Sequence, residues 1–197
     1  MSNPSADPGQ RVYLRRVTRG DETEFVQLMR ESQTLHEPWI SPPTNAMLFK
    51  YYLQRTDRED HEGFVICRVG DDLIVGAVNV NNIVRGSFLS ASIGYYVGAK
   101  YHAEGYMREG LMLLVSYAFN TMGIHRLEAN IQPDNLRSKQ LVARCGFEHE
   151  GYSKNFLYIN GAWRDHERWC CVDTRISLRV SVVPMVHKPN KPTQDLE

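Results

Sequence analysis

Residues 94–114 read GYYVGAKYHAEGYMREGLMLL, which predicts a strand, a short loop and the start of a helix. Aromatic and β-branched residues favour the strand. Apolar residues at helical spacing predict a helix over about 105–121, with one apolar face formed by Leu111, Leu114, Val115, Ala118 and Phe119. The first N–H groups of a helix lack intrahelical partners and carry partial positive charge, so a glycine-bearing loop before them can bind a diphosphate. Gly105 and Arg108 suit that role, although a tight turn that binds nothing has the same pattern.

A second polar joint follows in the segment NIQPDNLRSKQLVARCGF, residues 130–147. Asn135 and Ser138 are three residues apart on the first turn of a helix predicted over 135–147, so they lie on the same side of it. Asn135 fits a helix cap. Since Asp134 or Asn135 already supplies the cap, Ser138 is a candidate for a chemical role. Gly146 fits the left-handed residue that ends such a helix.

The remaining pattern predicts one mixed sheet. Asp21 followed by Glu24 fits a capping-box start for a helix that runs to about residue 32. Asn160-Gly161 predicts a hairpin turn. Strands are expected at 11–17, 63–69, 73–83, 87–97, 125–132, 147–158 and 163–172, and another helix at about 45–56. The economical fold is α/β (mixed α+β): a mostly antiparallel sheet of about seven strands that includes a parallel pair, with helices on both faces.

Composition restricts the class of protein. The chain has 197 residues, 42% of them hydrophobic, enough for one substantial core. Lysine plus arginine equals aspartate plus glutamate at 23 each, which gives no sign of a nucleic-acid partner. No apolar run approaches the ~18 residues of a membrane span, and the first ten residues do not read as a signal peptide. We therefore expect no direct nucleic-acid or membrane partner and a cytoplasmic location.

The cysteines and the ends of the chain give weaker information. Cys67, Cys145, Cys170 and Cys171 lack the spacing of a metal site or a disulfide framework, so buried free thiols and no bound metal are expected. Residues 1–10 are expected to be a flexible tail, 11–172 the folded domain, and 173–197 a partly disordered extension. The pattern leaves a monomer and a homodimer both open.

Residues 11–172 resemble the GNAT superfamily of acetyltransferases. The loop Lys100-Tyr-His-Ala-Glu-Gly105 resembles the Q/R-x-x-G-x-G/A loop of that family, with Lys100 replacing Gln/Arg and Ala103 replacing the first glycine. Asn135-x-x-Ser138, with Gly146-Phe147, resembles the RimJ/RimL branch, which acetylates the N-terminal residue of ribosomal proteins. The stretches 79–88, 124–135, 146–152 and 160–169 are similar to the RimJ side of that branch.

This resemblance implies acetyl-CoA as the cofactor, bound where the strand carrying Tyr95-Tyr96-Val97 splays from the strand at 125–132. The pantetheine arm would pair with backbone near Val97, and the N–H groups from His102 to Met107 would hold the pyrophosphate. The implied cofactor residues are Tyr96, Val97, His102, Ala103, Glu104, Gly105, Tyr106, Met107, Arg108, Asn135, Arg137 and Ser138. If Ala103 needed a positive φ, its Cβ would cost roughly 1–2 kcal/mol. Because Gly105 is retained, we expect the loop to avoid that geometry.

The resemblance also suggests catalytic and acceptor residues. The glutamate base and tyrosine acid of many GNAT enzymes fall on Asn130 and Val142, and a hairpin glutamate of some relatives falls on Leu157, so all three are absent. Ser138 would act as the acid and Asn130 could orient a deprotonating water. Weaker alternatives for the base are Glu128, for which a surface salt bridge is the simpler role, and His166. Candidate acceptor-binding residues are Glu37, Trp39, Tyr95 and Trp163.

Three functions remain open at this point. The first is acetyl transfer to the N-terminal α-amino group of a protein, such as a ribosomal protein. The second is acetyl transfer to a small-molecule amine, such as a polyamine, an antibiotic or an amino-acid derivative. The third is a catalytically silent module that binds CoA or a protein, which the altered loop at Ala103 and the missing glutamate and tyrosine would favour.

Overall fold

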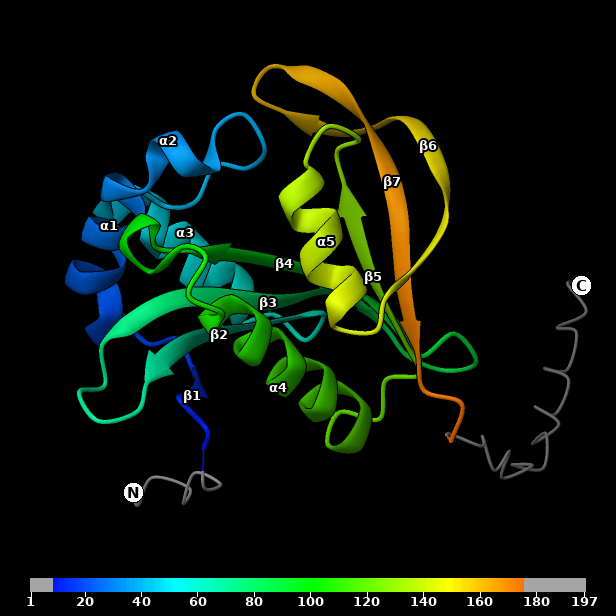
Figure 1. Ribbon diagram of the computed structural model, residues 1–197, viewed down its shortest axis with the longest axis horizontal. Coiled ribbons are helices and arrows are strands. Elements are labelled where there is room, and N and C mark those ends of the chain that lie inside the picture. Colours follow the sequence, from blue (N-terminus) through cyan, green and yellow to red (C-terminus); the bar gives the residue numbers. More distant parts are fainter. Residues whose placement is uncertain (1–8, 176–197) are drawn as a thin grey trace, which may run out of the picture.

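A computed structural model describes residues 9–175, which form one seven-stranded sheet (Figure 1). The predicted tail at 1–10 and extension at 173–197 lie mostly outside these residues. The sheet order is β1-β2-β3-β4-β5-β7-β6, antiparallel except for the parallel pair β4 and β5. The strands are β1 Val12–Arg16, β2 His61–Arg68, β3 Ile74–Val84, β4 Ser90–Val97, β5 Arg126–Ile131, β6 Glu148–Ile159 and β7 Ala162–Val172. The predicted mixed sheet, its parallel pair and the hairpin turn at Asn160-Gly161 are confirmed.

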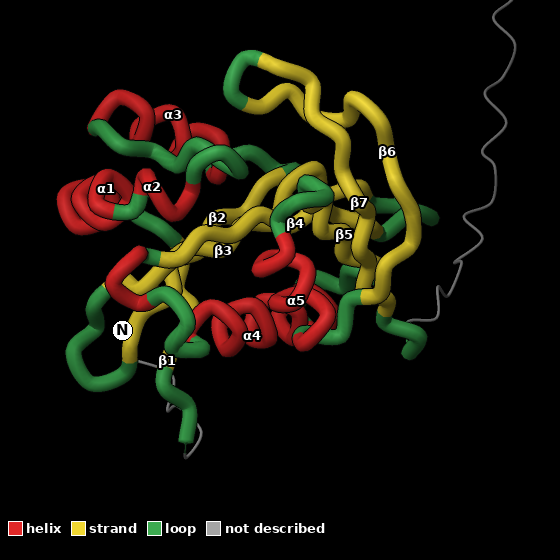
Figure 2. Tube along the Cα trace, turned by 45° about the horizontal axis from the view of Figure 1, so that its top comes forward, coloured by secondary structure: helices red, strands yellow, loops and turns green. Residues whose placement is uncertain are grey.

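Helices cover both faces of the sheet, as predicted (Figure 2). One face carries α1 (Glu22–Glu31), α2 (Gln33–His36) and α3 (Ala46–Thr56), and the other carries α4 (Tyr106–Asn120) and α5 (Leu136–Arg144). Two 3-10 turns, Arg19–Asp21 and Ala99–Tyr101, and the short α2 were not predicted. Within residues 9–175, no helix is both long and apolar enough to cross a membrane.

The core follows from the helix and strand periodicities. On α4, Leu111, Leu114 and Ala118 are completely buried, while Val115 and Phe119 at the margin of the predicted face are partly buried. On the other side of the sheet, Phe25 of α1 packs against Phe49 of α3 with ring centroids 5.1 Å apart. Both rings are completely buried, so each layer of helices is held by its own apolar contacts with the sheet.

Two local predictions were wrong. Asp21 and Glu24 do not form a capping box, because both carboxylates bond elsewhere: Asp21 accepts hydrogen bonds from Arg15 and from the main-chain N–H of Thr18, and Glu24 from the N–H of Ile74. Of the four cysteines, which are all free thiols, only Cys67 is buried. The other three lie on the margins of α5 and β7, where part of each side chain remains exposed.

The parallel pairing of β4 with β5 stops early. Ser90–Ile93 pair with Arg126–Ala129, and the strands then separate although β4 continues to Val97 and β5 to Ile131. The last four residues of β4 therefore have no partner on the β5 side. This is the splay that the resemblance implied, and it places an exposed strand edge in the middle of the sheet.

The stability of this arrangement can be tested at Gly110, where α4 crosses β2. A Cβ added to Gly110 would lie 2.4 Å from Cδ1 and 2.8 Å from Cγ1 of Ile66, which is completely buried. Gly110→Ala should therefore lower the free energy of unfolding by about 1–2 kcal/mol, as overpacking does, as measured by urea denaturation. In an Ile66→Val background the loss should be smaller, because the nearest methyl is gone. A gain of about 1 kcal/mol, the usual effect of this change in a helix, would contradict the packing.

Candidate active site

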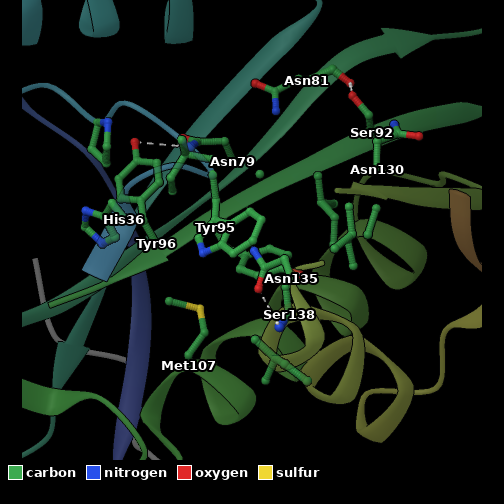
Figure 3. A pocket seen from close by; sticks show the side chains of 18 of the residues that line it. His36, Asn79, Asn81, Ser92, Tyr95, Tyr96, Met107, Asn130, Asn135 and Ser138 are labelled. Atoms are coloured by element: carbon green, nitrogen blue, oxygen red, sulfur yellow. Dashed lines mark hydrogen bonds between the residues drawn. The ribbon is translucent and has the colours of Figure 1, made fainter. Parts of the chain in front are cut away.

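A cavity of about 1300 Å³ opens at the splay between β4 and β5. Its lining comes from both faces of the sheet. Figure 3 shows Tyr95, Asn135 and Ser138 grouped in one part of it and His36, Asn79 and Tyr96 in another. We call the α4–α5 part the cofactor side and the α2–α3 part the acceptor side.

The cofactor side contains the predicted diphosphate loop. Gly105, with φ of 88°, is the residue before α4, and no side chain caps the helix. The N–H groups of the first turn are thus available to a ligand. Ala103, Gly105, Met107 and Arg108 line the cavity. Glu104 and Tyr106 do not line the cavity. Their main-chain groups, not their side chains, are therefore suited to contact a bound nucleotide.

The prediction that Ala103 avoids a positive φ was wrong. Its φ is 66°, so the loop of four residues between Tyr101 and Tyr106 contains two left-handed positions, and keeping Gly105 does not relieve Ala103. Arg11 holds the loop from outside. Its Nη2 donates to the Glu104 carbonyl at 3.0 Å, its guanidinium pairs with Glu109, and it lies 4.8 Å from the centroid of the Tyr106 ring.

Three arginines add positive charge to the cofactor side. Arg108, Arg137 and Arg144 line the cavity, are exposed, and form no ion pair with any residue from 9 to 175. They are suited to hold phosphate groups. Arg144 was missed in the sequence. The spacing of Arg137, Gln140, Leu141 and Arg144 could have revealed it, because residues at i, i+3, i+4 and i+7 share one face of a helix.

At the start of α5, one residue caps the helix and another is available for a chemical role. The Asn135 side-chain oxygen accepts a hydrogen bond from the Ser138 main-chain N–H at 3.1 Å, so Asn135 is the cap. The Ser138 hydroxyl is not used for capping, lines the cavity and lies 2.5 Å from the Tyr95 hydroxyl. Tyr95 was predicted to bind the acceptor, but its hydroxyl lies on the cofactor side.

The acceptor side presents amides and hydroxyls from three neighbouring strands, including Asn81, Ser92 and Asn130. Asn79 is almost completely buried, and its side-chain oxygen accepts a hydrogen bond from the Tyr52 hydroxyl at 2.7 Å. Asn130 Oδ1 is buried without a hydrogen-bond partner in the described chain, which suits it to receive one from a ligand or water. No sequence pattern pointed specifically to Asn79 or Tyr52.

Charged groups are few on the acceptor side, and they include Arg55 of α3, which lines the cavity, is exposed and forms no ion pair within residues 9–175. Glu128 is the single acidic residue among the described residues that line the cavity, and Arg126 Nε donates to it at 2.9 Å. The predicted salt bridge of Glu128 is thus confirmed. Burial lowers the pKa of His36, whose Nε2 donates to the Val97 carbonyl at 2.9 Å. Burial also lowers the pKa of His166, whose Nδ1 donates to the Arg164 carbonyl at 3.0 Å.

The segment 37–43 covers the acceptor side, and we call it the roof. Hydrogen bonds attach it to the tip of the β6–β7 hairpin. Asn160 Nδ2 donates to the Pro38 carbonyl at 3.2 Å, and its oxygen accepts from the Ser41 hydroxyl at 2.7 Å. Gln132 Nε2 donates to the carbonyl of Trp39, which lines the cavity. The other two predicted acceptor residues are not brought to the cavity: Glu37 is exposed, and Trp163 is 61% exposed and lies against Tyr158.

Within residues 9–175, no group of three or more His, Cys, Asp or Glu side chains is placed to hold a metal ion. A nucleotide-sized cavity, an uncapped helix N-terminus and unpaired arginines beside a strand edge instead define an acyl-CoA-dependent transferase site. The particular family is shown by comparison. The family profile "Acetyltransferase (GNAT) domain" matches residues 11–148, and the chain belongs to this family.

Individual relatives agree with this assignment. The chain is 29% identical over 167 residues to "Probable N-acetyltransferase YjcK" of Bacillus subtilis, covering 81% of this chain and 92% of that one. It is 48% identical over 93 residues to the ribosomal protein uS5-alanine N-acetyltransferase of Escherichia coli, covering 47% of this chain and 48% of the relative. The structure of Mycobacterium smegmatis RimJ in complex with CoA-disulfide matches with a TM-score of 0.76 and 27% identity, over 85% of this chain and 84% of that one. The protein is an N-acetyltransferase that uses acetyl-CoA.

The strain at Ala103 leads to a testable prediction. Ala103→Gly should raise the free energy of unfolding by up to about 1 kcal/mol, because relief of the left-handed strain exceeds the entropy cost of glycine. Ala99→Gly is the matched control, since Ala99 is exposed and its φ is not positive. This variant should have a free energy of unfolding about 0.5–1 kcal/mol lower. Urea denaturation measures both. If the free energy of unfolding falls by the same amount in both variants, Ala103 is not strained.

The roof leads to another prediction. Asn160→Gly keeps a residue that tolerates the φ of 50° but removes the bonds to Pro38 and Ser41. Amide hydrogen exchange in segment 37–43 should become faster, while exchange in the loop 102–108 stays unchanged. Asn155→Gly is the control, because Asn155 is in the same hairpin with φ of 46° and its side chain forms no hydrogen bond to the roof. Unchanged exchange in Asn160→Gly would show that the hairpin does not hold the roof.

Proposed function

We propose that the protein acetylates the N-terminal α-amino group of another protein, and that this occurs in the cytoplasm. The observation that carries the proposal is that the described residues of the acceptor side include no unpaired carboxylate. Asn81, Ser92 and Asn130 can exchange hydrogen bonds with a peptide main chain, and the one carboxylate, Glu128, is paired with Arg126. A polyamine carries several positive charges and would be favoured by unpaired carboxylates.

Acetyl-CoA would bind on the cofactor side. The main-chain N–H groups from Ala103 to Met107, together with Arg108 and Arg137, would hold its phosphates, whereas the expected N–H of His102 is already bonded to the Ala99 carbonyl. The edge of β4 at Tyr96 and Val97, which has no partner strand, would pair with the pantetheine arm as an added strand pairs with a sheet, through groups other than the Val97 carbonyl, which accepts from His36. These residues would place the acyl end near Ser138 and Asn135, which lie across the splay on α5.

The chemistry requires an uncharged amine and a proton for the leaving sulfur. Bound acetyl-CoA supplies the acetyl group as a thioester that an amine can attack directly. An α-amino group has a pKa of about 7.7–8, so roughly a tenth is already neutral at pH 7, and a water oriented by Asn130 suffices to take up the remaining proton. The Ser138 hydroxyl, which is not used for capping, donates a proton to the thiolate.

The relatives support a protein acceptor more than a polyamine. The Escherichia coli relative named for the uS5 alanine is 48% identical, although over about half of each chain. The spermidine N(1)-acetyltransferase of Vibrio cholerae is 23% identical over 161 residues. An acceptor side without an unpaired carboxylate among its described residues is consistent with the first relation, and a protein of ribosomal type is therefore the first acceptor to test.

The test is release of CoA thiol from acetyl-CoA in the presence of peptides beginning with alanine or serine, the same peptides with a blocked N-terminus but a free lysine, and spermidine. The free N-terminal peptides should be acetylated and the other two should not. Ser138→Ala should lower kcat on the order of 100-fold, the lower range for loss of a general acid. Ser116→Ala, which changes an exposed serine of α4, should leave kcat unchanged.

If spermidine is acetylated in preference to the peptides, the acceptor is a small amine and not a protein N-terminus. Unchanged turnover in Ser138→Ala would remove the proposed acid while leaving the acceptor assignment intact.

A further inference from the structure

Tyr95 and Ser138 form an isolated pair of hydroxyl groups. They come from β4 and α5, 43 residues apart, and their oxygens are 2.5 Å apart. Neither hydroxyl forms another hydrogen bond within residues 9–175. Tyr95 and Ser138 both line the cavity, and each is partly buried (Figure 3).

The neighbouring tyrosine shows that this contact is specific to Tyr95. Successive side chains of a strand point to opposite faces, so Tyr96 projects to the acceptor side. Its hydroxyl lies 3.4 Å from the amide nitrogen of Asn79 and has no contact with α5. Strand β4 therefore supplies one phenol to each part of the cavity, and the one on the cofactor side meets Ser138.

The direction of the hydrogen bond decides what Ser138 can do. A hydroxyl has one hydrogen to donate and two lone pairs to accept with. If the serine donated to Tyr95, its hydrogen would be used inside the protein. If Tyr95 donates, the serine hydrogen is free to point into the cavity. Burial raises the pKa of the Tyr95 phenol, although the hydrogen bond with Ser138 acts in the opposite direction, so the phenol retains its hydrogen at neutral pH.

We propose that Tyr95 is a positioning residue that donates its hydrogen bond to Ser138 Oγ and thereby directs the serine hydrogen toward the sulfur of the bound thioester. This inference rests on the proposed role of Ser138 as proton donor. As the C–N bond forms and the C–S bond breaks, the proton of Ser138 passes to the sulfur. The serine oxygen then regains a proton through solvent from the acceptor nitrogen, which loses one. Tyr95 keeps its own proton throughout.

The first experiment is a double-mutant cycle with Tyr95→Phe, Ser138→Ala and the double variant, assayed with the best peptide acceptor. Tyr95→Phe should lower kcat by about tenfold, the effect of one well-placed hydrogen bond, and leave KM for acetyl-CoA nearly unchanged. In the Ser138→Ala background the same change should have no further effect, because there is no serine hydrogen left to direct. Equal losses in both backgrounds, or a change confined to KM, would overturn the proposal.

A second experiment does not depend on turnover. The thiol of bound CoA is titrated by the ultraviolet absorbance of its thiolate, as a difference from the protein without CoA. A hydrogen bond from Ser138 favours the thiolate and lowers the thiol pKa. Tyr95→Phe should raise the pKa of the bound thiol by roughly half a unit to one unit, as expected for one hydrogen bond, and Ser138→Ala should raise it at least as much. An unchanged thiol pKa in Tyr95→Phe would overturn the proposal.

The control is Tyr117→Phe, which removes a partly buried phenol that donates to Glu62 and does not line the cavity. It should alter neither kcat nor the thiol pKa. Thermal unfolding with and without CoA checks that each variant is folded. If no peptide is acetylated by the wild type but the thiol titration behaves as expected, the protein acceptor fails while the role of Tyr95 stands. If peptides are acetylated and Tyr95→Phe behaves like the control, the role proposed for Tyr95 fails while the protein acceptor stands.

Discussion

The early end of the pairing between β4 and β5 is the constraint on which the rest of the site depends. A fully paired parallel strand would use its hydrogen-bonding groups and close the sheet. Here pairing ends at Ile93 and Ala129, so Gly94–Val97 present an edge to a cavity that reaches both faces. An unpaired edge in the middle of a sheet is costly unless something binds it. In a family whose members use acetyl-CoA, an extended pantetheine arm offers a matching row of donors and acceptors.

The splay also explains the distribution of charge. The cofactor side gathers Arg108, Arg137 and Arg144 next to the uncapped start of α4, so fixed positive charge accumulates where a nucleotide would lie. The acceptor side presents neutral amides, Arg55 and one carboxylate already paired with Arg126. Two chemically different compartments therefore meet at one strand. The alternation of Tyr95 and Tyr96 gives each compartment a phenol from adjacent residues.

Much of the fold followed from local sequence signals, and the errors have physical causes. Strand alternation, the apolar face of α4 and the Asn160-Gly161 turn depend on neighbouring residues, so they were predicted. The capping box of Asp21 with Glu24 does not form because Asp21 bonds to Arg15 and forms its capping box with Thr18, three residues earlier, while Glu24 bonds to the N–H of Ile74. The φ of Ala103 depends on the closure of the whole loop and on Arg11, 92 positions away. The contact of Tyr95 with Ser138 depends on how α5 packs over β4, which periodicity does not describe.

The absence of a carboxylate at Asn130 has a chemical consequence under the proposed function. A strong base on β5 would deprotonate many kinds of amine, whereas a site that relies on water accepts mainly amines that are already neutral. At pH 7 roughly a tenth of α-amino groups are neutral, but well under a thousandth of lysine side chains with a pKa of about 10.4. The difference is more than two orders of magnitude before any contact with the acceptor is formed. A weak base and an acceptor side without unpaired carboxylates among its described residues therefore act together: the first selects the α-amino group by its pKa, and the second recognises the attached peptide by hydrogen bonds rather than by attracting a polycation.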